Sequence, residues 1–402
     1  MTLRPGMRFL LITLFLVVLI TSLAVGIRAS LGDVILGADL YTRWVGGRAF
    51  LDGRNPYSPA VTLESQLGIY GRPAQPDEDQ VAFAYPPHSL IWLLPIVWLD
   101  FPWAQAVWLA LQLVLLAIVL NACSSNAPIL FRFLPFFTYP IALGLILGNF
   151  SLTIGVILLL GFNFFTKRGN LSPITQYSLG FSLALATIKP QLVWLSLFFL
   201  LALAFRRRYH RVWISFFASL AALGLAFLIF IPNWPADWTN QVFAYTAYDL
   251  GDPVIYTMLS IPLPSSLAVF ASIFLGIILI GLTILFFLRW WHGKMIGLFL
   301  FSWCGWLTYL LHPNGMAYEQ ISFYVPMFLW VMQPEVYRTK GIIWGWGLWL
   351  LLGWLAFLIG RWVFPPADVM PVLFFGGWLA WFVRNPGRLE MGMGKPSSGL
   401  PG

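Results

Sequence analysis

The 402-residue chain is 59% hydrophobic and only 9% charged, with 35 Phe and 21 Trp. A soluble globular protein has about 25% charged residues, so this composition excludes an ordinary soluble enzyme. It predicts a polytopic all-α membrane protein, because a helix satisfies all its backbone polar groups within lipid. We assign the net charge of +8 to cytoplasmic loops and expect membrane lipid, not nucleic acid, as a partner.

The N-terminal segment resembles a signal sequence, since Arg4 and Arg8 precede an apolar run over 9–27. No small-x-small cleavage site follows the run, which is long enough to cross a bilayer. We therefore expect an uncleaved first membrane helix that begins in the cytoplasm. The polar segment 33–85 then becomes the first outer loop.

Within this loop, residues 40–51 alternate apolar groups with arginines and predict a short interfacial helix. Asp39 lies at its start, where it could act as a base or cap the helix, since Asp is a favoured N-cap. The Asp52–Pro56 segment is typical of a turn that ends the helix. The acidic run 77–79 could bind a divalent cation, but a solvated loop is the favoured interpretation. We predict no catalytic metal site.

Residues 86–166 contain four apolar pieces, at 86–99, 103–121, 128–147 and 149–166. The placement of Lys and Arg requires an odd number of crossings in this part of the chain. One piece is therefore expected to be re-entrant or half a span, and the pattern leaves open which one.

The second half alternates basic clusters with apolar segments, which places five clusters and both termini in the cytoplasm. About 12 transmembrane helices result, in one domain over 1–384, with a disordered cytoplasmic tail at 385–402. The helices expected here are 177–188, 191–205, 212–232, 265–288, 295–311, 317–333, 341–364 and 369–383.

The outer face collects most of the acidic and polar residues, including the turn at Lys189, the segment 233–256 and the segment 312–320. A lysine between two apolar helices is either functional or reaches the headgroups with its long stem. His312 could bind substrate or be a neutral hydrogen-bonding residue at a helix end. Glu319 could line the same pocket or pair with an arginine.

The chain carries a series of short motifs, which are Asp39-Leu40-Tyr41, Asn55-Pro56-Tyr57, Tyr85-Pro86-Pro87, Gly148-Asn149, Lys189-Pro190, His312-Pro313 and Tyr318-Glu319-Gln320. Together these motifs resemble those of glycosyltransferase family 87, a family of membrane enzymes with the C-type fold. The resemblance implies a C-type bundle and a polyprenyl-phosphate sugar as donor, as in mannosyl- and arabinosyltransferases. Gly-Asn departs from the Gly-Gln that this family more often shows.

Transfer of a sugar from a lipid phosphate needs a carboxylate to take the acceptor proton and cations to stabilise the departing phosphate. Asp39 is the expected base. Lys189, Arg43 and Arg48 are the expected phosphate ligands, although the arginines, with Arg54, could equally anchor lipid headgroups. The resemblance implies that substrate contacts come from Tyr41, Asn55, Tyr57, Tyr85, His312, Tyr318 and Glu319.

The leading hypothesis is a multi-pass cell-membrane enzyme whose active site faces the outer side. It would be an inverting glycosyltransferase that moves a hexose or pentose, with mannose as the first guess, to a lipid or glycan acceptor. It would need no cofactor beyond its lipid-linked donor. A lipid or glycan transporter (flippase) is the main rival, and a receptor or scaffold is the third alternative. The halves of the chain do not match as those of many transporters do.

Overall fold

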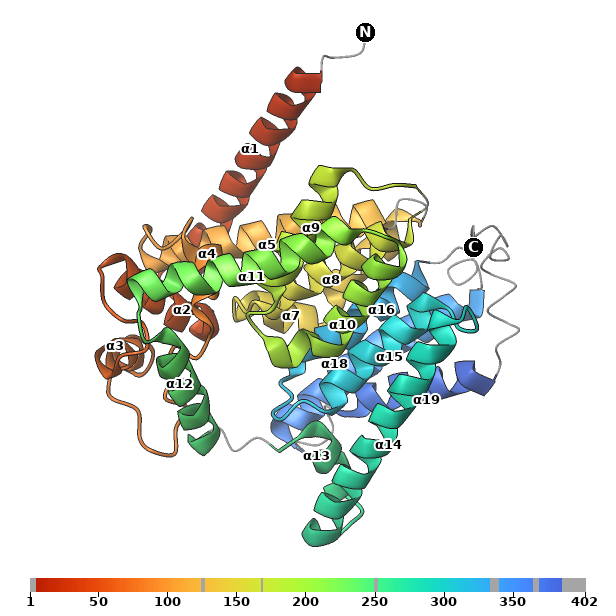
Figure 1. Ribbon diagram of the computed structural model, residues 1–402. Coiled ribbons are helices and arrows are strands. Elements are labelled where there is room, and N and C mark those ends of the chain that lie inside the picture. The colour runs from red at the N-terminus through yellow and green to blue at the C-terminus, as the bar shows by residue number, and fades with distance from the viewer. Residues whose placement is uncertain are drawn as a thin grey trace.

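The computed structural model describes residues 5–123, 127–167, 169–248, 252–332, 340–363 and 369–384, which contain helices and no strand. Figure 1 shows α1 projecting from one end of a packed bundle and α14 reaching out on another side. The helices are α1 Pro5–Leu31, α2 Ala38–Leu51, α3 Pro59–Tyr70, η1 Pro87–Ser89, α4 Leu90–Leu93, α5 Phe101–Cys123, α6 Ile129–Phe133, η2 Leu134–Phe137, α7 Tyr139–Ile146, α8 Ser151–Thr166, α9 Pro173–Ala186, α10 Pro190–Arg206, α11 His210–Phe230, α12 Trp234–Tyr248, α13 Val254–Ser260, α14 Ser265–Trp291, α15 Gly297–Leu310, η3 Ala317–Gln320, α16 Ile321–Val331, α18 Lys340–Trp362 and α19 Met370–Arg384.

Among the described helices, α1, α5, α11 and α14 are long and apolar enough to cross a membrane. Shorter apolar helices, including α8, α10 and α15, pack beside them. Most side chains of α1 are exposed, which is the expected behaviour of a helix whose solvent is lipid. These features make the chain a helical membrane protein, whereas the 12 crossings and the sidedness stay predictions.

The four apolar pieces between 86 and 166 form two continuous helices, α5 and α8, and two broken segments. The first broken segment holds only η1 and α4, because Pro95 lies two residues after the end of α4 and disfavours a helical conformation at Leu94 before it. The second is divided among α6, η2 and α7, with Pro135 and Pro140 at the joints. Proline thus interrupts two pieces, where a single irregular piece was expected.

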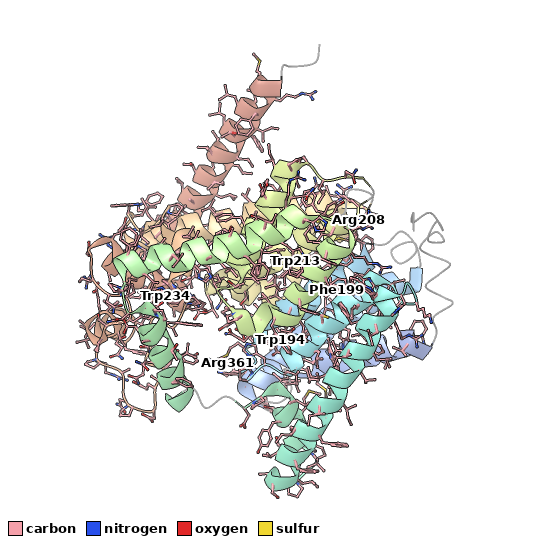
Figure 2. All side chains as sticks on the ribbon, in the orientation of Figure 1. Trp194, Phe199, Arg208, Trp213, Trp234 and Arg361 are labelled. Carbon is pink, nitrogen blue, oxygen red and sulfur yellow. The ribbon has the colours of Figure 1, made fainter. Side chains whose placement is uncertain are left out.

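The later helices fall within a few residues of the expected ranges, but three helices were not anticipated. They are α3 in the first loop and α12 and α13 within 233–256. Indole groups fix α12: Trp234 Nε1 donates to the Gly224 carbonyl at 3.1 Å, and Trp238 Nε1 donates to Ala84 at 3.2 Å. Figure 2 shows Trp234 at the junction of α11 and α12. The expected tail, 385–402, lies outside the described residues.

The centre of the bundle is formed by α8, α10, α15 and α16, and every residue of α16 is buried. Aromatic rings join these helices, as in the stacked pair Phe162 and Phe301, whose centroids are 4.7 Å apart. This packing brings the starts of α8, α10 and η3 close to the start of α2.

Candidate active site

The start of α2 is held by a buried amide on α5. Gln105 Oε1 accepts hydrogen bonds from the backbone N–H groups of Leu36 and Gly37, each at 2.9 Å. The Leu40 N–H donates to the carbonyl of Leu147 at 3.2 Å. Gly37 is the N-cap of α2, so Asp39 lies in the first turn and not at the capping position. The Asp39 carboxylate is therefore not needed as a cap. It points instead to the α7–α8 turn, which carries Asn149.

The α7–α8 turn fits against α2 because residue 148 is glycine. Gly148 has φ of +65°, and a Cβ atom there would lie 2.7 Å from Leu40 Cβ. Trp108 Nε1 donates to the Gly148 carbonyl at 3.0 Å, and Gln112 Nε2 donates to the Asn149 carbonyl at 3.0 Å. Two side chains of α5 thus fix the turn that carries Asn149.

A chain of polar contacts begins at Asp39 and crosses three helix starts. Asn149 Nδ2 donates to Asp39 Oδ2. The amide oxygen of Asn149 accepts from the backbone N–H of Ser151 at 2.8 Å and from its hydroxyl at 2.7 Å. Ser151 Oγ in turn accepts from Lys189 Nζ at 3.2 Å. Asp39 and Lys189, which lie far apart in sequence, therefore belong to one connected cluster.

The chain continues from Lys189 to a buried ion pair. Lys189 Nζ lies 2.8 Å from Glu319 Oε1, and Glu319 Oε2 lies 3.2 Å from His312 Nε2. The Asn314 N–H donates to His312 Nδ1 at 3.2 Å, which leaves the proton of a neutral imidazole on Nε2, facing the carboxylate. Burial favours a higher pKa for Glu319, but Lys189 and His312 hold that pKa below its usual value.

The exposure of the carboxylates in this cluster separates their roles. The side chain of Asp39 is 31% exposed, whereas those of Lys189 and Glu319 are 5% and 4% exposed. Glu319 is occupied by the Lys189 ammonium and the His312 imidazole, whereas Asp39 keeps an open face. Asp39 is consequently the carboxylate in this cluster that a substrate can reach.

Arg43 lies one helical turn after Asp39, with Nη2 at 3.9 Å from Asp39 Oδ2. Its guanidinium donates to the hydroxyl of Tyr85 and lies over the rings of Tyr85 and Phe150, at 4.2 and 5.1 Å from the centroids. Nε and Nη1 are buried without a hydrogen-bond partner. A buried cation with two free donors beside a carboxylate is suited to bind an anion.

Two further predicted residues border this cluster. The ring of Tyr85 lies between the two cations, 4.2 Å from Arg43 Cζ and 5.9 Å from Lys189 Nζ. The ring of Tyr318 lies 5.1 Å from Lys189 Nζ. Both tyrosines thus provide aromatic faces next to the charged groups.

Four predicted residues make other contacts. Arg48 is exposed and contacts Trp44 and the carbonyl of Leu99. Tyr41 packs edge-on against Phe101, Asn55 donates to Asp237 at 2.7 Å, and Tyr57 donates to the carbonyl of Tyr85 at 2.6 Å. Asn55 and Tyr57 therefore fold the first loop onto α12 and onto the segment that carries Tyr85. In the acidic run, Glu78 is bound by Arg72 at 2.6 and 2.7 Å, which accords with a solvated loop.

Sequence reasoning missed Ser151 and gave no role to Asn149. The Gly148-Asn149 pair was visible as a motif, but the hydrogen bond across 110 residues to Asp39 was not. Ser151 carried no signal of its own, since a serine at a helix start is commonly a cap. Both residues are fully buried, with 0% exposure.

An apolar groove of about 710 Å³ runs between α13 and α14. Its wall includes Leu311, which precedes His312, and the Val254 N–H donates to the His312 carbonyl at 3.2 Å. A second groove of about 300 Å³ lies between α10 and α14, and Ile280 lines both. The side of α14 that faces the bundle thus offers apolar space, and the wall of the larger groove ends at Leu311, one residue before His312.

A comparison with protein families finds a match to glycosyltransferase family 87 over residues 83–313, more than half of the chain. The matched segment includes Tyr85, Asn149, Lys189 and His312, and it begins after Asp39. Neither a curated protein nor a solved structure gives a significant match.

Proposed function

The chain belongs to glycosyltransferase family 87, and we propose that it transfers a hexose or pentose from a polyprenyl-phosphate donor. The acceptor is a hydroxyl of a membrane lipid or glycan. Its oxygen forms a bond to the sugar C1 as the bond from C1 to the phosphate oxygen breaks. The electron pair leaves with the phosphate, and the acceptor proton passes to Asp39. This direct displacement inverts the configuration at C1.

The observation that carries this proposal is the position of Asp39. Its carboxylate is partly exposed, anchored by Asn149 on one oxygen, and adjacent to the guanidinium of Arg43. A general base must reach the proton that it removes and must keep its orientation while doing so. Buried Glu319 is held by Lys189 and His312 and is unsuited to this role.

Arg43 is the best-supported ligand for the donor phosphate. The Arg43 side chain is only 4% exposed, so donor binding has to uncover it. Its two free donors would then meet two phosphate oxygens, and its charge would stabilise the negative charge that grows on the leaving group. The starts of α2, α8 and α10, which also carry partial positive charge, lie at the same cluster. Lys189 stabilises the site without contacting the phosphate, because its ammonium is already paired with Glu319.

The apolar grooves along α14 suit the hydrocarbon chain of a lipid substrate. The larger groove is lined mostly by apolar side chains, and it adjoins His312 at the edge of the polar cluster. A lipid-linked sugar could then keep its chain in the membrane while its head reaches Asp39. We propose that this head lies on the outer side of the cell membrane.

The proposal is tested by transfer from a defined donor. Purified protein in lipid nanodiscs is incubated with radiolabelled polyprenyl-phosphate mannose and an extract of membrane glycolipids, and labelled products are separated. Polyprenyl-phosphate arabinose serves as the second donor, since hexose and pentose are both within the proposal. Transfer from either donor by the wild-type protein supports it. Binding of both donors without any product from either would contradict it.

A further inference from the structure

The amide of Asn149 has an orientation that its neighbours determine. Its oxygen accepts two hydrogen bonds from Ser151, from the backbone N–H at 2.8 Å and from the hydroxyl at 2.7 Å. With the oxygen held on that side, Nδ2 must point the other way, where it donates to Asp39 Oδ2. Asn149 is fully buried, so water does not compete for either end of the amide.

We propose that Asn149 is a positioning residue that fixes the Asp39 carboxylate for proton transfer, with Ser151 fixing the Asn149 amide in turn. This inference rests on the proposed function of Asp39 as the base.

The contacts to Asp39 are uneven between its two oxygens. Asn149 donates to Oδ2, and the nearest nitrogen of Arg43 also approaches Oδ2, at 3.9 Å. Oδ1 is thereby left to meet the acceptor hydroxyl. An amide suits this role because it donates without a net charge and does not accept the proton itself. A carboxylate at position 149 would repel Asp39 and compete for the proton.

The charged and titratable groups that face Asp39 come from its own helix and from two other elements. Arg43 lies on α2, Lys189 precedes α10, and Tyr318 lies in η3. All three remain in each variant described below. Any new pH dependence in an Asn149→Asp protein is therefore due to the added carboxylate and its interaction with residue 39.

A charge-swap cycle tests the contact in the full-length protein in detergent. The variants are Asn149→Asp, Asp39→Asn and the double variant that carries both changes. Their apparent unfolding temperatures are measured between pH 5 and pH 8. Asn240→Asp, an exposed change on α12, is the matched control for adding one carboxylate.

Asn149→Asp should lower the unfolding temperature by roughly 5 °C at pH 8 and by less at pH 5. The two adjacent carboxylates share a proton in the folded protein at a pH where the unfolded chain has released it. Stability therefore falls as pH rises. The double variant should regain most of the loss and its wild-type pH profile, because it restores one amide and one carboxylate. Additive effects with no recovery would overturn the proposed contact.

The positioning role has its own measurement, in the polyprenyl-phosphate mannose assay. Asn149→Ala should lower kcat by about 100-fold with little change in KM, since it misplaces the base without touching the donor. Asn149→Gln, which can still donate to Asp39, should retain more activity. Equal and wild-type-like kcat values for both would overturn the role. If the wild-type protein transfers no sugar, the proposed function fails, and the charge-swap result still decides the Asn149 contact.

Discussion

The ammonium of Lys189 lies 2.8 Å from the carboxylate of Glu319, although 130 residues separate them in sequence. Both side chains are almost fully buried, so each is the main charge partner of the other. The pair joins the start of α10 to η3 and, through Ser151, to the turn that holds Asp39. Arg43 at the candidate site, by contrast, keeps two donors, Nε and Nη1, without a partner.

Removal of one member of this pair should strongly destabilise the protein. Lys189→Met leaves the Glu319 carboxylate buried without its main partner, at an expected cost of about 3–5 kcal/mol in the free energy of unfolding. Unfolding of the detergent-solubilised variant measures this loss. The double variant Lys189→Met with Glu319→Gln should recover a large part of it. The exposed pair of Arg54 and Glu64 is the control, and wild-type-like stability of Lys189→Met would contradict the assignment.

Arg43 should determine the affinity for the donor phosphate. Loss of a charge-assisted hydrogen bond costs roughly 1.5–3 kcal/mol, so Arg43→Gln should weaken polyprenyl-phosphate binding by about 10- to 100-fold. Arg43→Lys keeps the charge but not the fork of donors, and an intermediate loss is expected. The measurement is the dissociation constant of polyprenyl phosphate for each variant in lipid nanodiscs. Arg48→Gln is the matched control on the same helix, and an equal loss there would place the phosphate elsewhere.

The sequence predicted which polar residues lie at this site better than it predicted which of them contact one another. Asp39, Lys189, His312 and Glu319 were all anticipated, because polar residues at the ends of apolar helices are conspicuous. The pairing of Lys189 with Glu319 was not, since it depends on how α10 and η3 pack. An arginine was the expected alternative partner for Glu319.

Gly148 should be needed for the position of Asp39. Gly148→Ala introduces strain at a φ of +65° and a clash with Leu40, whose Cβ would lie 2.7 Å from the new atom. We expect a loss of about 2–4 kcal/mol in stability and a parallel loss of transfer. Gly53→Ala is the control for strain alone, because Gly53 has a φ of +72° and a Cβ atom there would meet nothing within 4 Å. Equal effects of the two changes would show that the α2 contact is unimportant.

His88 should make the protein less stable in acid. Burial lowers its pKa to about 4, below the usual value of 6.5. Between these pH values the unfolded chain binds a proton that the folded chain does not, so stability falls as pH decreases from 6.5 to 4. His88→Gln should flatten that part of the profile of unfolding temperature against pH. The exposed His210→Gln is the control, and an unchanged slope in His88→Gln would refute the prediction.

The fold was predictable where hydrophobic runs are long and bounded by charge, as in α1, α11 and α14. It was less predictable where aromatic residues occur in polar segments. Trp234 and Trp238 suggested an outer loop, yet their indole groups bind carbonyls of distant segments and stabilise α12 as a helix. Prolines at 95, 135 and 140 were visible in the sequence, but hydropathy alone did not show where they divide the apolar pieces.

Substitution of Asp39 by Asn tests the central claim most directly. Asn has nearly the same shape, and its side-chain oxygen can still accept the hydrogen bond from Asn149, but it cannot take up the acceptor proton. The account predicts that Asp39→Asn binds polyprenyl-phosphate mannose with near wild-type affinity and unfolds near the wild-type temperature. Its kcat for transfer should fall by at least about 100-fold. Wild-type-like kcat for this variant would contradict the assignment of Asp39 as the general base.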